Sequence, residues 1–233
     1  MEGGETRRRF IDGVLSQGDS LYLESLLNYN KVLSQRNALL KYFAANNTFD
    51  SHTLEVYNEQ LHYLATPIYQ KRIAFIEEFI PIFEKRYHSI NEYEKVSIEY
   101  TSHLHEKNLL EHLQNNQSQD LRATYTNYGI HRDDLLFNLN NHSIRRYGSQ
   151  GQKKSYLIAL KLAQFDFIKK DTNVNPILLL DDIFDKLDEK RVAQLIKLVD
   201  AENFGQLFIS DTHPERTENV IKQVHQSYKM IKL

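Results

Sequence analysis

The sequence predicts an α/β fold with a central, largely parallel sheet and an inserted antiparallel helical hairpin. Two apolar runs predict the sheet: residues 177–180 close on two aspartates, and residues 206–210 follow after a stretch with helical spacing at 188–200. Two long apolar stripes with helical spacing, separated by a short polar stretch, predict the hairpin.

Composition excludes several classes of protein. The chain has 233 residues, 41% of them hydrophobic, which is enough for a substantial core. Its net charge of −2 gives no global basic field, and the absence of cysteine excludes disulfides and thiolate metal sites. No run approaches the roughly 18 apolar residues of a membrane span, and the polar N-terminus lacks a signal-peptide core. We therefore expect a soluble cytoplasmic protein without a membrane partner.

The first helix of the hairpin is predicted at 21–45. Residues 2–12 are charged and indicate a turn-rich start, and the pair Asp19 and Ser20 offers an N-cap. The stripe includes Arg36 at a position where an apolar residue is expected. Its other members are Leu26, Tyr29, Leu33, Leu40 and Phe43.

The second helix of the hairpin is predicted to begin at a Ser51 cap and to carry its stripe through 54–83. Pro67 and Pro81 each lack a backbone N–H, so we expect them to kink or end this helix. A stripe of this kind is far more typical of a core than of a base-stacking surface.

The middle of the chain mixes both patterns. Residues 94–100 alternate and predict a half-buried strand, and residues 106–125 return to helical spacing. His103, His105 and His112 lie in this region, but neither helical pairing nor a carboxylate cluster supports a metal site.

A dense charged turn at 129–134 predicts an Arg–Asp network at the entry to a strand at 135–140. Asn140 and Asn141 favour a hairpin turn leading to a partner strand at 143–147. Alternation at 220–233 predicts edge strands.

Ser149, Gln150, Gly151 and Gln152 precede a helix whose apolar face begins at Tyr156. A helix N-terminus attracts phosphate, glycine allows close approach of the backbone, and serine adds a hydroxyl donor. Alone, the pattern is also that of an ordinary N-cap. Residues 148–155 nearly spell the phosphate loop G-x-x-x-x-G-K-[ST], but lysine stands where that loop needs its second glycine, and no strong strand precedes it.

Acidic residues follow both predicted parallel strands. Asp181 is placed to hold Mg²⁺, and Asp182 to orient a water on a γ-phosphate. Asp211 or His213, after the second strand, occupies the position of a γ-phosphate sensor, and the sequence leaves both open.

Several motifs in order resemble the RecF family, bacterial recombination-mediator ATPases of the ABC/SMC class. They are GGETRRRFID, LNYNKVLSQRNALLK, GIHRDD, YGSQGQKKSYLIALKLAQ, PILLLDDIFDKLD and GQLFISDT, and they cover nearly the whole chain. One departure is Ile130, where the family usually has proline.

The resemblance implies site roles. Residues 149–152 correspond to the signature motif, which contacts the γ-phosphate of ATP held by the opposite subunit. Asp181 corresponds to the Walker B acid for Mg²⁺, Asp182 to the catalytic carboxylate, and Leu187 with Asp188 to the D-loop at the dimer interface. The resemblance also implies that residues 1–18 are the remnant of an N-terminal lobe, 19–93 a helical arm, and 94–233 the lobe of an ABC-ATPase head that carries the signature and Walker B motifs.

The complete protein, by resemblance, binds ATP and Mg²⁺, forms a homodimer and binds single-stranded and gapped DNA. It acts with other recombination-mediator proteins in repair and in the SOS response. Seven cations are candidate DNA contacts, each also readable as a solvated or internally paired side chain: Arg7, Arg8, Arg9, Arg145, Arg146, Lys153 and Lys154.

The family's Walker A motif does not occur in this sequence, so we expect the isolated chain to lack ATPase activity. The alternative function is a non-catalytic interaction module that complements a separate chain bearing Walker A.

Overall fold

The computed structural model describes residues 3–172, 177–181, 206–224 and 228–231. The chain forms two compact units, one of residues 1–78 and 98–136 and the other of residues 79–97 and 137–233. The described part is mostly helical, with one three-stranded sheet and one separate parallel pair of strands. This agrees with the predicted α/β class, and the predicted boundaries at 18 and 93 stay a prediction. No described helix has the length and apolar character needed to cross a membrane.

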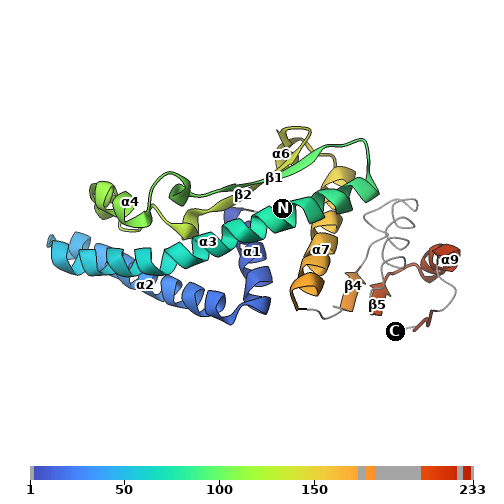
Figure 1. The fold of residues 1–233 in the computed structure, drawn as a ribbon, viewed down its shortest axis with the longest axis horizontal. Coiled ribbons are helices and arrows are strands. Elements are labelled where there is room, and N and C mark those ends of the chain that lie inside the picture. Colours follow the sequence, from blue (N-terminus) through green and yellow to red (C-terminus); the bar gives the residue numbers. More distant parts are fainter. Residues whose placement is uncertain (1–2, 173–176, 182–205, 225–227, 232–233) are drawn as a thin grey trace. The chain divides into compact units, whose positions relative to one another are not determined.

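Three helices begin the chain, and Figure 1 shows two of them, α2 and α3, running side by side as a hairpin. The bounds of the three helices are α1 Gly4–Gly18, α2 Ser20–Asn46 and α3 Ser51–Ile90. The predicted turn-rich start is wrong, because α1 already begins at Gly4.

The ends of the hairpin helices are fixed by side-chain caps. The Asp19 carboxylate accepts from the backbone N–H of Tyr22 at 2.9 Å, which confirms the predicted cap of α2. At α3 the predicted Ser51 cap is wrong. The Asp50 carboxylate accepts from the N–H groups of His52 and Thr53, so Asp50 performs that role.

The two prolines do not end α3, which runs continuously to Ile90. Pro67 and Pro81 are both exposed, as are the residues four positions earlier, Tyr63 and Glu77. The carbonyls that lose a helical partner therefore lie on the wet side of the helix, where water replaces the missing N–H.

Arg36 lies in the buried stripe of α2, as the spacing predicts, and its side chain is 0% exposed. Its Nε donates to the Asn58 Oδ1 of α3 at 2.9 Å, and its Nη1 donates to Asp120 at 2.8 Å and to Thr126 at 2.7 Å. The apolar core around it includes Tyr22, Tyr29, Leu61, Ile68, Leu109 and Leu113.

The rest of the first unit consists of short elements. The single helix predicted at 106–125 is instead two helices that break at Asn116. The elements are η1 His103–His105, α4 Leu109–Asn115, α5 Gln117–Ala123 and η2 Ile130–Arg132.

The three-stranded sheet has the order β1-β2-β3, with β1 at Val96–Thr101, β2 at Asp134–Leu139 and β3 at His142–Ser143. Asn140 and Asn141 have φ of 49° and 64°, which confirms the predicted hairpin turn. The partner strand predicted at 143–147 is wrong beyond Ser143. A short helix, α6 Ile144–Tyr147, follows because the backbone N–H of Gly148 bonds the Ile144 carbonyl at 3.0 Å.

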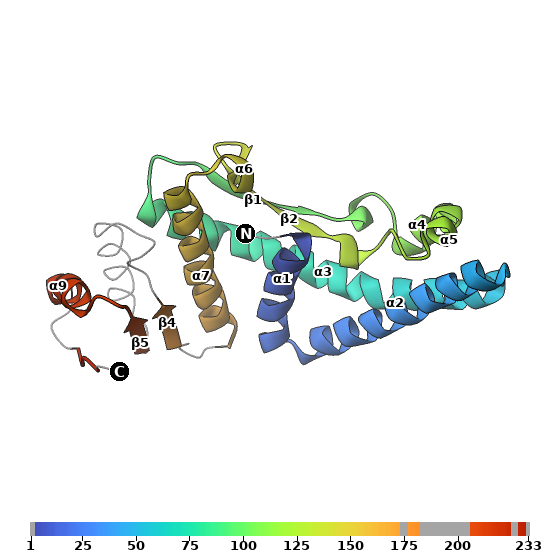
Figure 2. The same cartoon turned by 180° about the vertical axis from the view of Figure 1, so that it is seen from behind.

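The second unit contains α7 Gln150–Thr172. The ring of Tyr156 on this helix packs against the rings of Phe83, Tyr87 and Phe137. Strands β4 Ile177–Asp181 and β5 Gln206–Ser210 pair in parallel, as predicted (Figure 2). The predicted helix at 188–200 lies outside the described residues. The edge strands predicted at 220–233 are wrong at their start, because α9 spans Pro214–Val224, and residues 228–231 form no strand.

Candidate nucleotide half-site and its cations

Ser149 caps α7 through a reciprocal pair of hydrogen bonds. The backbone N–H of Gln152 donates to the Ser149 Oγ at 3.2 Å, and the backbone N–H of Ser149 donates to the Gln152 Oε1 at 2.7 Å. This capping box leaves the N–H groups of Gln150 and Gly151 in the first turn, where the helix supplies no acceptor. Together with the positive end of the helix dipole they suit an anion.

The side chain of Gln152 is fixed from a second side. Its Nε2 donates to the Glu94 Oε1 at 2.8 Å, and the Tyr87 hydroxyl donates to the other oxygen of the same carboxylate. Sequence reasoning missed Glu94, because no local pattern links it to a motif 58 residues away. Glu94 therefore orients the Gln152 side chain at the start of α7.

The phosphate-loop reading of residues 148–155 is contradicted by the backbone. Such a loop connects a strand to a helix, whereas here the helix α6 precedes it, and Lys153 already lies inside α7. The backbone N–H of Lys153 bonds the Ser149 carbonyl at 3.0 Å, as a helical residue does.

Asp181 is the last residue of β4, and its side chain is exposed. It pairs in register with Ser210, the last residue of β5, whose hydroxyl donates to the Asp181 carboxylate. These two side chains offer only oxygen donors, which are the ligands that Mg²⁺ prefers, at the carboxyl edge of a parallel pair. The residues present therefore fit the predicted metal, although no described group of three or more His, Cys, Asp or Glu side chains forms a metal site.

The two candidate sensor residues differ in their contacts. The Asp211 Oδ2 accepts from the Thr217 hydroxyl of α9 at 2.7 Å and from the backbone N–H of His213 at 3.2 Å, so this carboxylate is tied to the start of α9. His213 is exposed, and its Nδ1 lies 2.9 Å from the Thr212 hydroxyl. Asp182 and Asp188 lie outside the described residues.

The three N-terminal cations all have intramolecular partners. Arg7 forms a two-point contact with the Asp134 carboxylate at 2.8 and 2.7 Å. Arg8 donates to the Asp133 carbonyl at 2.7 Å, and Arg9, which is exposed, pairs with Glu5 at 2.6 Å. Burial acts to raise the pKa of Asp134, but the bond and charge of Arg7 outweigh it, and the pKa is lowered.

The other four cations lie between the end of β3 and the start of α7. Arg145 and Arg146 are exposed, and Lys153 and Lys154 are half-buried. None of the four forms an ion pair with a carboxylate in the part of the chain that the structure describes. Of the seven candidate DNA contacts, these four are the ones whose side chains have no hydrogen bond or ion pair to another described residue.

The charged turn at 129–134 is a structural network, as its composition predicts, but its partners are distant in sequence. Arg72, which is buried, donates to the Asp133 carboxylate at 2.6 Å and to that of Asp12 at 2.8 Å. The Nε2 of His131 lies 3.0 Å from the Thr126 carbonyl. Burial lowers the pKa of His131 to about 4, so this ring is neutral near pH 7.

His131 and its neighbours are therefore held by contacts within the first unit. The Nδ1 of His131 lies 2.8 Å from the Tyr29 hydroxyl, and the Arg132 guanidinium lies 5.2 Å from the ring centre of Tyr125. Gly129 has φ of +140°, and a Cβ there would lie 2.4 Å from the Tyr29 hydroxyl, so glycine is required.

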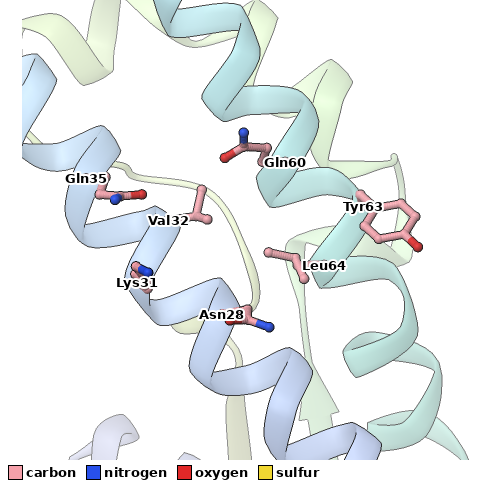
Figure 3. Close-up of a pocket in the computed structure, with 7 residues that line it drawn as sticks. All are labelled: Asn28, Lys31, Val32, Gln35, Gln60, Tyr63 and Leu64. Atoms are coloured by element: carbon pink, nitrogen blue, oxygen red, sulfur yellow. The ribbon is translucent and has the colours of Figure 1, made fainter.

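An open groove of about 360 Å³ lies between α2 and α3 (Figure 3). Val32 and Leu64 contribute its apolar side chains, and the other lining residues are Asn28, Lys31, Gln35, Gln60 and Tyr63. It contains no acidic residue and none of the predicted site residues.

Comparison with known proteins identifies the relatives. No protein-family model matches the chain. RecF of Flavobacterium johnsoniae, a DNA replication and repair protein, is 58% identical over 234 residues, covering 100% of this chain and 65% of that protein. RecF of Phocaeicola vulgatus is 46% identical over 230 residues, covering 98% of this chain and 61% of that protein.

Two solved structures of the recombination mediator RecF, from the RecFOR pathway, have a similar fold. RecF with ATP has a TM-score of 0.79 and 31% identity, covering 91% of this chain and 58% of that one. RecF with ATPγS has the same TM-score and 30% identity, covering 91% and 59%. In both sequence and fold, this chain is thus similar to RecF, and it spans less than two thirds of the length of these relatives.

Proposed function

We propose that this chain is the part of a RecF-type DNA replication and repair protein that supplies the signature motif and the Mg²⁺ acid of an ATP site. The observation that carries this proposal is the 58% identity to a RecF protein along the whole chain. In the complete protein, the ATP-bound homodimer would hold single-stranded and gapped DNA in recombinational repair and the SOS response, together with other recombination mediators.

The geometry of the described residues supports this division of roles. The N–H groups of Gln150 and Gly151, with the Ser149 hydroxyl, would bind the γ-phosphate of a nucleotide held by the other subunit. Asp181, aligned by Ser210, would hold the metal. Asp182 would orient the attacking water and Asp188 would lie at the dimer interface, as the resemblance implies. ATP and Mg²⁺, when bound, supply the reactive phosphate and the neutralisation of its charge.

Hydrolysis of ATP tests the proposal directly. The chain alone should show no Mg²⁺-dependent turnover, because no Walker A backbone or lysine holds the phosphates. Adding a separately produced Walker A segment from a RecF relative should restore turnover. Ser149→Ala and Asp182→Asn should each abolish most of it. Ser89→Ala is the matched control, since its exposed hydroxyl only bonds the Lys85 carbonyl of its own helix.

Two results would contradict the proposal. Turnover by the chain alone that disappears in Asp182→Asn would show that it holds nucleotide without Walker A. A mixture that associates stably but stays inactive would favour the alternative, a non-catalytic interaction module.

A further inference from the structure

Two tyrosines near the signature motif are strongly exposed. Tyr93 follows α3 and is 90% exposed, and Tyr147 ends α6 and is 73% exposed. Both belong to the second unit. Exposed aromatic rings present flat faces on which an unpaired base stacks.

Hydrogen bonds hold the loop of Tyr93 beside the segment of Tyr147. The backbone N–H of Lys95 donates to the Asn140 Oδ1 at 2.9 Å, and the backbone N–H of Asn140 donates to the Lys95 carbonyl at 2.7 Å. Glu94 bonds Gln152 at the start of α7. The loop is therefore bonded to Asn140 and to Gln152, which lie before and after Tyr147 in the chain.

The position of Tyr147 is also defined by its own neighbours. Its ring meets that of His142 edge to face, with centroids 5.8 Å apart. A Cβ on Gly148 would lie 2.6 Å from the Ile144 carbonyl oxygen, so the chain turns tightly immediately after Tyr147. A ring held in this way loses little freedom when a ligand stacks on it.

The charge around Tyr147 is positive. Residues 135–165 contain no aspartate or glutamate. Arg145 and Arg146 are exposed, without a carboxylate partner among the described residues. On the loop, Glu94 is occupied by internal bonds, and Glu92 is an exposed carboxylate.

We propose that these residues form a binding surface for single-stranded DNA, which we call the tyrosine surface. Its members are Tyr93, Lys95, His142, Arg145, Arg146 and Tyr147. The rings would stack on unpaired bases and the cations would contact the phosphates between them. Bases in a duplex are already stacked, so the surface selects single strands. This inference rests on the proposed function, DNA binding, and adds the place where the single strand is held.

Fluorescence anisotropy with a labelled oligothymidine tests the inference, using the chain alone and the chain mixed with the Walker A segment and ATP. Tyr93→Ala and Tyr147→Ala should each weaken binding by about 5- to 150-fold, the effect of losing one stacked base. The Phe variants should bind like the wild type. Tyr63→Ala is the matched control, because that ring is 79% exposed but lies in the other unit.

Salt dependence separates the two kinds of contact. Arg145→Gln with Arg146→Gln should reduce the slope of log affinity against log salt by about 1.4, whereas Tyr147→Ala should leave it unchanged. Duplex affinity should not change in the tyrosine variants. Glu92→Gln should strengthen binding, since it removes a repulsive charge.

The possible outcomes distinguish this inference from the proposed function. Normal binding of the single strand by both Ala variants overturns the inference and leaves the proposed function intact. Weaker ATP binding with unchanged DNA binding in Tyr147→Ala would assign the ring to the nucleotide and also overturn it. A wild type that binds no DNA in either condition overturns both.

Discussion

Removing the carboxylate of Asp120 should destabilise the first unit severely. This side chain and that of Arg36 are both 0% exposed, and their contact is 2.8 Å. Asp120→Ala would leave the guanidinium charged in a site where its Nη2 already has no hydrogen-bond partner among the described residues. Breaking one side of a buried pair costs about 3–5 kcal/mol. That is a large share of the roughly 5–15 kcal/mol that stabilises a typical protein.

The measurement is the free energy of unfolding in urea, followed by far-UV circular dichroism. Arg36→Met with Asp120→Leu removes both charges. The free energy of unfolding that this double variant loses should be smaller, by at least about 2 kcal/mol, than the sum of the losses in the two single variants. Glu5→Gln, which breaks an exposed pair with Arg9, should cause no measurable change. A cost below about 1 kcal/mol for Asp120→Ala, or additive single changes, would refute the role assigned to this pair.

Two further predictions concern the charged turn and the start of α7. His131 binds its proton with a pKa of about 4 in the fold but about 6.5 when unfolded, so the unfolded chain takes up more protons between these values. The free energy of unfolding should therefore fall by about 3 kcal/mol as pH drops from about 6.5 to 4, and a His131→Gln variant that keeps this loss would contradict the assignment. Gly148→Ala should displace Ser149, because its Cβ would meet the Ile144 carbonyl; in the reconstituted mixture ATP turnover should fall while the melting temperature changes little, and unchanged turnover would contradict this.

The elements that local chemistry determines were predicted well. Asn140 and Asn141 favour left-handed backbone, and the structure places both there. The seven-residue spacing of the α2 stripe placed Arg36 inside, where it is buried. The parallel pairing of β4 and β5 followed from their apolar runs.

One error came from a local contact that the pattern did not reveal. The turn at Asn140 and Asn141 predicts a partner strand at 143–147, but the backbone N–H of Gly148 bonds the Ile144 carbonyl, and residues 144–147 are helical. Other errors arose where contacts distant in sequence override a local pattern. Composition favours solvated side chains for Arg7 and Arg8, yet they contact Asp134 and Asp133 respectively, more than 120 positions away. The bond from Gln152 to Glu94, and that from Tyr87 to the same carboxylate, were equally beyond a local pattern.

The cap of α7 has a consequence for how an anion would bind. The Ser149 oxygen uses a lone pair to accept from Gln152, which leaves the hydroxyl proton free to point elsewhere. A phosphate oxygen that accepts this proton adds a bond to the beginning of the helix and displaces none. The helix would therefore not have to unwind by even one residue to admit an anion, and binding at this position would require only the rotation of a hydroxyl group.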